Sequence, residues 1–243
     1  CFRKYSVLTA FMSSKNVFRS PVGKKLITGI TGLGLVVFAL EHMIGNLAMF
    51  SGNDAYNEYA HFLSSLGPLL YVFEAGLVAF FLFHISNGIQ IWYGSRKARP
   101  VGYDSYRSAG KPSQQSVSSR SMIVTGLILA VFLVIHLISF KFGPGGPGNA
   151  DPSYVTSLGG EPARDLAKLV RHKFDSPFYA FGYSIVMLML VVHLRHGIWS
   201  AFQSLGAMRP SLTPLVYGLG TILAIAIGLG FIALPLAIYF HII

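Results

Sequence analysis

The sequence contains a single cysteine, Cys1, and few charged residues. One thiol cannot build a disulfide framework within the chain, nor supply the cysteine ligands of an iron–sulfur cluster or a structural zinc site. Charged residues make up only 12% of the chain against 53% hydrophobic residues, which excludes an ordinary soluble domain. Because the first residue is not methionine, we expect a processed or incompletely recorded amino terminus. A lipid-anchored cysteine is the alternative, but it would require a preceding signal.

Five apolar runs are long enough to cross a membrane. They cover residues 26–50, 68–93, 122–142, 177–202 and 214–240. We therefore predict an all-α polytopic membrane protein with five transmembrane helices, forming one membrane domain over residues 1–243. Four other segments complete the prediction. Residues 1–20 and 55–66 fit interfacial segments, residues 101–119 a polar loop, and residues 161–174 a surface helix on the outer membrane interface.

The net charge of +10 comes from basic residues at the ends of the spans, so a nucleic-acid partner is not expected. The loop between the first two spans has no Lys or Arg, which predicts a cytoplasmic amino terminus and a carboxyl terminus on the far side of the inner membrane. Five basic residues between the third and fourth spans oppose this orientation, with Asp151, Glu161, Asp165 and Asp175 beside them. The basic residues that favour it are Arg3, Lys4, Lys15, Arg19, Lys24, Lys25, Arg96, Lys97, Arg99, Arg107, Lys111 and Arg120.

One segment of the chain occurs twice. Residues 30–42 and 124–136 share Thr, Gly, Leu, Val, Phe and His at the same offsets, 94 residues apart. The even spans repeat as well, because His84 and His193 each lie 16 residues after a proline and four before a glycine. The first two spans therefore form a helical hairpin that recurs as the third and fourth, related by a pseudo-two-fold axis along the membrane normal. The fifth span lies outside the repeat.

Four histidines occupy equivalent places in these hairpins. His42 and His136 fall in the outer half of the bilayer and His84 and His193 in the inner half, so each pair faces across the axis. Two facing histidines in a helix bundle can provide both axial ligands of one haem. Sixteen helical residues span about 24 Å in a core about 30 Å thick, which separates the two levels by roughly one to two dozen ångströms.

We therefore predict a di-haem four-helix bundle with two b haems. The other ring nitrogen of each imidazole should donate its hydrogen to a backbone carbonyl or to water. Small residues on the ligand helices would leave room for the macrocycles, namely Gly32, Gly126, Gly88 and Gly197.

Other interpretations of the histidines compete with this one. Hydrogen-bonded core histidines would need no ligand, but four of them at paired depths on a repeated framework favour metal or haem ligation. A zinc or copper site would gather its ligands at one level. His196 competes with His193, and the repeat aligns His193 with His84. His196, with Arg195 and Trp199, could instead contact a haem propionate or close the inner interface.

Two carboxylates, Glu41 and Glu74, lie within apolar spans toward the outer side. A buried carboxylate stays protonated or finds a partner. Two interpretations stay open for each: a hydrogen bond to a neighbouring helix or to a haem propionate, or proton transfer at the level of the outer haem.

The repeated Thr-Gly-Leu…His segments, the four span histidines and the His-x-x-x-Gly-Ile-Trp run from His193 to Trp199 resemble the di-haem cytochrome b subunit of succinate:quinone oxidoreductases. This is the single-anchor, five-helix type, also found in fumarate reductases, and the resemblance covers nearly the whole chain. It implies an anchor for a flavoprotein with covalent FAD and a three-cluster iron–sulfur protein. Electrons then pass from succinate through the flavin and the clusters to a quinone bound in the anchor, usually menaquinone in this type. The resemblance assigns His84 and His193 to the proximal haem and His42 and His136 to the distal one.

The resemblance also implies a quinone site near the distal haem, where the family has a glutamate shortly before the second span. Glu58, beside Tyr59 and His61, occupies the comparable position. A pocket at the inner ends of the spans is the alternative, with Lys24, Ser20 or Arg120.

Two other functions remain open from the sequence. Another quinone-linked di-haem cytochrome b would have the same haems but different partners. A secondary transporter would use the histidines for substrate or protons and would bind no haem. The sequence leaves open whether the complex oxidises succinate or reduces fumarate.

Overall fold

The computed structural model describes residues 20–98, 101 and 117–243. Almost all of the predicted amino-terminal interfacial segment (1–20), including Cys1, lies outside the described residues. So does most of the predicted polar loop (101–119), whose last residues, from Val117, already belong to a helix.

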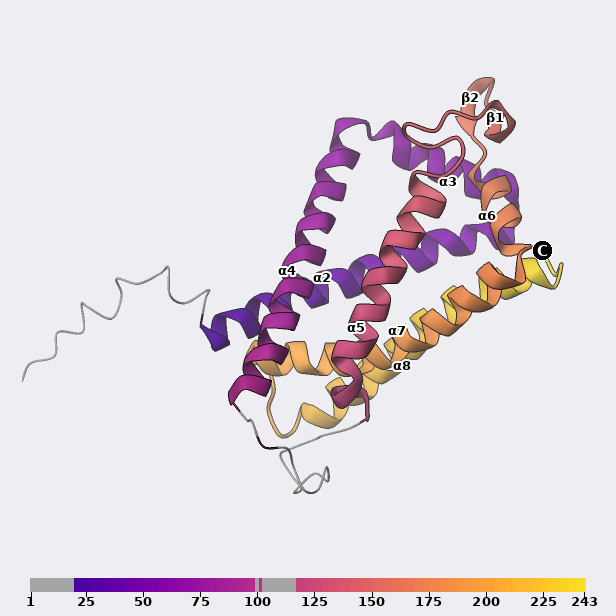
Figure 1. Cartoon of the computed structure of the whole chain (residues 1–243). Helices are drawn as coiled ribbons and strands as arrows, with labels where there is room; N and C mark the ends of the chain where they lie inside the picture. The colour runs from indigo at the N-terminus through magenta and orange to yellow at the C-terminus, as the bar shows by residue number, and fades with distance from the viewer. Residues whose placement is uncertain (1–19, 99–100, 102–116) are drawn as a thin grey trace, which may run out of the picture.

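Five long helices dominate the described chain (Figure 1). All five are long and apolar enough to cross a membrane, which confirms the prediction of an all-α polytopic membrane protein. Two of them continue into short irregular turns: a 3₁₀ turn, η2 (Ala48–Ser51), follows the first, and a π-helical turn, η3 (Leu137–Lys141), follows the third. The five helices are α2 (Pro21–Leu47), α4 (Pro68–Ala98), α5 (Val117–His136), α7 (Pro177–Ser204) and α8 (Thr213–Tyr239).

The helices extend beyond the predicted apolar runs. Helix α2 begins at Pro21 rather than residue 26, and Ser20 caps it by accepting a hydrogen bond from the Gly23 amide at 3.0 Å. Helix α4 continues to Ala98, and α5 begins at Val117. Hydropathy detects only the apolar part of a span, whereas a helix satisfies its own backbone hydrogen bonds and can carry lysine and arginine out to the headgroups.

The packing of the spans follows the sequence repeat only in part. Helix α2 packs on α4 as α5 packs on α7, in agreement with two equivalent hairpins. The contacts between the hairpins differ, however, because α2 packs closely on α7 whereas α4 and α5 barely touch. Helix α8 lies along α7 and also contacts α2 (Figure 1). The fifth span therefore closes one side of the bundle and leaves the pseudo-symmetric side more open.

The apolar core accordingly lies among α2, α7 and α8. One cluster consists of Val36, Leu194, Ile198, Ala224 and Ile227. By contrast, Asn87 is the only buried residue among the described residues of α4. Helix α4 is therefore the most peripheral of the spans.

A small cap covers one end of the bundle. It consists of helix α3 (Asn53–Ser65), the 3₁₀ turn η4 (Pro152–Tyr154), the antiparallel strands β1 (Val155–Leu158) and β2 (Glu161–Arg164), and helix α6 (Leu166–Phe174). Helix α3 covers nearly all of residues 55–66, which were predicted as an interfacial segment, and its place at the interface stays a prediction. The strands were not predicted.

The prediction of a helix over residues 161–174 is wrong for its first part. Residues 161–164 pair with β1, and Pro162 in this segment has no amide hydrogen for a helical bond. The helix begins only after Asp165, whose carboxylate accepts from the Lys168 amide at 3.0 Å. The apolar face of α6 also packs on protein, in a cluster with Met49, Leu234 and other residues of the bundle end, and not outward as a membrane-facing helix would.

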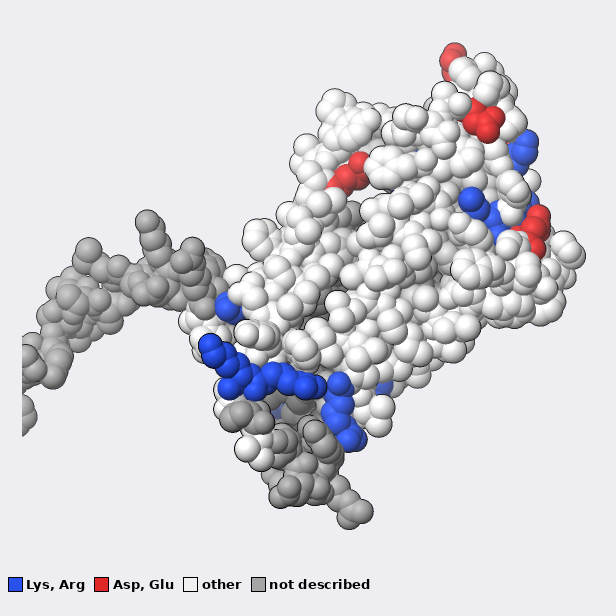
Figure 2. Space-filling model, viewed as in Figure 1, with Lys and Arg blue, Asp and Glu red and all other residues white. Residues whose placement is uncertain are grey.

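The two ends of the bundle differ in charge. At the end opposite the cap, lysine and arginine gather without visible acidic side chains, whereas basic and acidic side chains lie together near the cap (Figure 2). The basic end holds the start of α2, the end of α4 and the start of α5, with Lys24, Lys25, Arg96, Lys97 and Arg120. This distribution agrees with the pattern from which a cytoplasmic amino terminus was predicted, and the orientation itself stays a prediction.

Candidate cofactor site

His42 of α2 and His136 of α5 form the pair nearer the cap, called here the outer pair. Their ring centroids are 5.7 Å apart and the rings are nearly perpendicular, at 89°. Each ring stacks on a phenylalanine four residues earlier in its own helix, Phe38 for His42 and Phe132 for His136. The two phenylalanines occupy the same place in the sequence repeat, so the repeat supplies one stacking ring for each histidine.

His84 of α4 and His193 of α7 form the inner pair. Their ring centroids are 6.3 Å apart, with 67° between the ring planes. The two helices that carry this pair pack mainly on other helices: α4 packs on α2, and α7 packs on α5 and α8. The structure therefore brings the four histidines together in the two combinations that the repeat predicts.

The axial separation of the two levels follows from contacts along α2 and α5. Thr31 contacts His84, and it lies 11 residues before His42 on α2. Thr125 contacts His193, and it lies 11 residues before His136 on α5. Eleven residues of helix rise about 16 Å, within the range of one to two dozen ångströms expected from the sequence.

The residues around the inner pair include two that the sequence analysis missed. The hydroxyl Oγ1 of Thr31 lies 3.5 Å from His84 Nδ1, and that of Thr125 lies 3.1 Å from His193 Nδ1. The same His84 nitrogen lies 3.2 Å from the carbonyl oxygen of Thr28. The signal that could have revealed both threonines is the Thr-Gly pair at equal offsets in the two repeated segments.

The glycines of these Thr-Gly pairs also face the inner histidines. A Cβ built on Gly32 would lie 3.1 Å from His84 Cε1, and one on Gly126 would lie 3.4 Å from His193 Cε1. Both glycines were predicted to leave room for a macrocycle, which stays a prediction. In the structure each glycine lies beside the histidine of a neighbouring helix. At Gly88 and Gly197, the other two predicted positions, a Cβ would meet no described atom within 4 Å.

Within the described part of the chain, no such hydrogen bond reaches the rings of the outer pair. Nδ1 of His136 is buried and has no hydrogen-bond partner among the described residues. Its surroundings are aromatic instead, with Phe140 at 5.3 Å and Tyr183 at 6.2 Å between ring centroids. The expected donation from imidazole to a backbone carbonyl is therefore seen at His84, whereas His193 meets a hydroxyl and His136 has no partner.

The cap holds the two backbone segments that carry the outer pair. On α2, Asn46 donates to the His42 carbonyl at 2.7 Å and accepts from the Tyr56 hydroxyl of α3 at 3.1 Å. Burial, together with the neighbouring Tyr59, raises the pKa of Tyr56 to about 12, against an opposing effect of Arg164. Tyr56 therefore keeps its proton as a donor.

Arg164 of β2 holds the segment that follows His136. Its guanidinium donates to the carbonyls of Phe140, Gly143 and Pro144, the shortest bond being 2.7 Å to Phe140. Burial lowers the pKa of Arg164 from its ordinary value, but an arginine starts so high that it stays charged. One charged side chain thus satisfies carbonyls that the π-helical turn and the following loop leave free.

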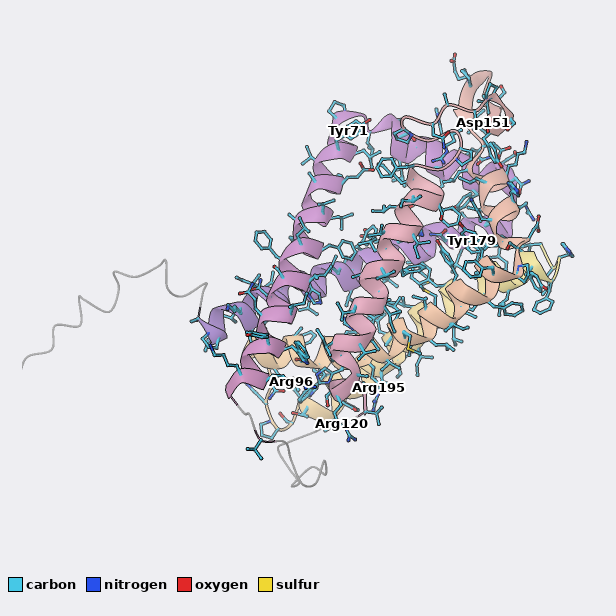
Figure 3. All side chains as sticks on the ribbon, in the orientation of Figure 1. Tyr71, Arg96, Arg120, Asp151, Tyr179 and Arg195 are labelled. Atoms are coloured by element: carbon cyan, nitrogen blue, oxygen red, sulfur yellow. The ribbon has the colours of Figure 1, made fainter. Side chains whose placement is uncertain are left out.

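His196, the competitor of His193, points elsewhere. Its ring contacts Trp199, at 5.9 Å between centroids, and not His84. Arg195 lies at the same end of the bundle as Arg96 and Arg120 (Figure 3). It donates to Ser118 and to the Tyr217 hydroxyl, while the buried Trp199 Nε1 has no partner among the described residues.

The outer-side carboxylates differ from one another. Glu74 of α4 forms an ion pair with Lys141 of the π-helical turn, and both side chains are about one-third exposed. This matches the interpretation of Glu74 as bonded to a neighbouring segment. Glu41 is not buried as expected but exposed on α2, and Glu58 lies exposed on α3 with Tyr59 and His61.

The donor set fits a haem better than a bare metal ion. Among the described residues, no group of three or more His, Cys, Asp or Glu could hold a metal ion. A porphyrin supplies four ligands itself and needs only the two axial ones that each pair offers. Two imidazoles on one metal, with bonds of about 2.0 Å, would have ring centroids about 6 Å apart, close to both observed spacings.

The fold and these pairs define a class of protein: a polytopic α-helical membrane protein with two levels of facing histidines. The family model described as "Succinate dehydrogenase/Fumarate reductase transmembrane subunit" matches residues 27–93 and 95–229. The chain belongs to this family, and all four histidines lie within the matched residues. Searches of curated proteins and of solved structures gave no match.

Proposed function

We propose that this chain is the single-anchor, di-haem cytochrome b subunit of a succinate:quinone oxidoreductase. Family membership supports a membrane subunit of a succinate dehydrogenase or fumarate reductase. The observation that carries the finer proposal is the pairing of His42 with His136 and of His84 with His193 at two levels. In this proposal each pair provides both axial ligands of one b haem.

A bound haem supplies one-electron chemistry, because its iron alternates between the ferric and ferrous states. The chain's own residues hold the rings that would ligate it. His84 and His193 are set by their contacts with Thr31 and Thr125, and His42 and His136 by stacking on Phe38 and Phe132. Neutral imidazoles in an apolar bundle suit this task, since a ligand nitrogen must carry a free lone pair.

The proposed partners are a flavoprotein with covalent FAD and an iron–sulfur subunit, docked on the cytoplasmic side of the inner membrane. The basic end of the bundle is the surface that we assign to them (Figure 2). Electrons would enter at the His84–His193 level, which lies toward that end, and reach quinone, specifically menaquinone. This places the first haem nearer the soluble subunits and the second nearer the cap.

For the quinone we propose the outer side, at Glu58. Glu58, Tyr59 and His61 are exposed on α3, and the Tyr59 ring lies so close to Gly45 of α2 that a Cβ there would overlap it. Gly45 is three residues after His42, so this face of α3 adjoins the outer pair. An inner site at Lys24, Ser20 or Arg120 is the alternative, although the Ser20 hydroxyl already caps α2.

A reduced-minus-oxidised spectrum of the purified complex tests the haem proposal. Two b haems per copy of this chain are expected, and their absence would contradict it. Succinate oxidation or fumarate reduction by the co-purified subunits distinguishes this complex from another quinone-linked cytochrome b. Glu58→Gln should lower quinone reduction while leaving electron transfer to a soluble dye unchanged. Equal loss of both activities would count against Glu58 as part of the quinone site.

A further inference from the structure

The repeated Thr-Gly pairs of α2 and α5 contact the histidines of α4 and α7, not those of their own helices. Thr31 and Gly32 lie against the ring of His84, and Thr125 and Gly126 against that of His193. The two threonines are 94 residues apart in the sequence. At both positions of the inner pair, the threonine therefore lies against Nδ1 of the imidazole and the glycine against Cε1.

Each threonine hydroxyl has one hydrogen to donate, and a backbone carbonyl already takes it. Thr31 Oγ1 lies 2.7 Å from the Ile27 carbonyl, and Thr125 Oγ1 lies 3.0 Å from the Ser121 carbonyl. Such bonds to the carbonyl four residues earlier are the usual choice of a helical threonine. Toward the imidazole, each hydroxyl can therefore act only as an acceptor.

The histidine nitrogen that faces an acceptor must carry the hydrogen. This holds for Nδ1 of His84 and of His193, and the Thr28 carbonyl gives the same answer independently at His84, because a carbonyl can only accept. A neutral imidazole has one N–H, so Nε2 keeps the lone pair. Both inner histidines are thereby fixed in the tautomer that offers Nε2 to a metal.

We propose that Thr31 and Thr125 are positioning residues that set the tautomer and the ligand strength of the inner histidine pair. An imidazole that donates its Nδ1 hydrogen becomes a more basic ligand through Nε2. The adjoining Gly32 and Gly126 let the ring edge approach the helix, since a Cβ at Gly32 would lie only 3.1 Å from Cε1. The inference rests on the proposed haem function and assigns a role to the Thr-Gly repeat.

The experiment compares Thr31→Val and Thr125→Val with the unchanged complex. Valine keeps the shape of threonine but removes the acceptor. We expect an upward shift of the midpoint potential of the inner haem, because a less basic ligand stabilises ferric iron less. The shift should be larger in Thr125→Val than in Thr31→Val, because the Thr28 carbonyl still accepts from His84 Nδ1 when Thr31 is replaced. The outer haem should keep its potential, and Thr31→Ser and Thr125→Ser should restore that of the inner one. The readouts are a potentiometric titration and the low-temperature spectrum of each haem.

Thr28→Val is the matched control. The Thr28 hydroxyl bonds to the Lys24 carbonyl at 2.8 Å in the same way, but only its backbone carbonyl contacts His84. An effect of lost helical bonding alone would therefore appear in this variant too. If a valine variant fails to assemble, the alanine variants Thr31→Ala and Thr125→Ala repeat the titration with a smaller side chain.

The outcomes separate this inference from the proposed function. Absence of haem from the unchanged complex would overturn both. The valine variants could instead bind the usual amount of haem and have the same inner-haem midpoint potential as the unchanged complex. This result would overturn only the role of the threonines. A shift of equal size in Thr28→Val or in the outer haem would overturn it as well.

Discussion

The two histidine levels are built from one repeated sequence but are held in different ways. At the inner level, a threonine hydroxyl faces each Nδ1 atom, and a backbone carbonyl also faces that of His84. At the outer level, aromatic rings surround the imidazoles, and His136 Nδ1 has no partner among the described residues. A hydrogen bond fixes the direction and the tautomer of a ring, whereas stacking fixes mainly its plane. The outer level depends instead on the cap, which holds the backbone near both outer histidines.

The strongest test of the comparison removes one ligand at a time. His84→Ala and His193→Ala should each abolish the same haem, and His42→Ala and His136→Ala the other, because each variant leaves one haem with a single axial ligand. Haem content per complex and the redox difference spectrum measure this. His196→Ala is the control and should retain both haems. Loss of the inner haem in His196→Ala, with His193→Ala harmless, would reverse the assignment of His193.

Removing the Arg164 side chain should destabilise the outer histidine pair more than the inner one. Arg164→Ala leaves several half-buried carbonyls without their charged donor, at a cost of about 1–3 kcal/mol. We expect a lower midpoint of thermal unfolding and loss of the outer haem at a lower temperature than in the unchanged complex. The absorbance of the outer haem during heating measures this loss. Arg171→Ala is the matched control, because Arg171 makes an exposed bond to Asn53 in the same cap. Simultaneous loss of both haems would show that the cap does not act on one level.

A methyl group at Gly32 should disturb the inner level with little effect on folding. In Gly32→Ala the Cβ would press on His84 Cε1, so the low-temperature spectrum of the inner haem should change. Gly34→Ala, two residues further along α2, places its Cβ against the Phe80 ring and no histidine. Its effect should fall on stability alone. An identical spectrum in Gly32→Ala and the unchanged complex would contradict the close approach.

The smallest expected effect concerns the ion pair between Glu74 and Lys141. Both side chains are about one-third exposed, and such pairs contribute about 0–1 kcal/mol. Glu74→Gln should therefore lower the midpoint of thermal unfolding only slightly, and less so at high salt, where the pair is screened. A large loss of the outer haem in this variant would instead indicate that the pair positions the π-helical turn after His136.

Much of this site could be predicted from sequence because its signals are local. The length and hydropathy of an apolar run identify a span. A polar side chain inside a span costs free energy, so four span histidines at paired depths indicate that they bind a ligand. The repeat then gives the pairing, since equivalent residues face one another across a pseudo-two-fold axis. The strands β1 and β2 escaped prediction because a four-residue strand next to Pro162 has no distinguishing period.

The sequence by itself determined the number of spans, the four candidate ligands and their division into two levels. Only the tertiary structure decided that Thr31 and Thr125 contact histidines on other helices, that α8 closes one side of the bundle, and that Arg164 reaches the π-helical turn after α5. The physical reason is that a sequence repeat identifies equivalent residues but does not determine which residues contact one another. Contacts between residues far apart in the sequence depend on how the helices and the cap pack and rotate against one another, and no local pattern encodes this.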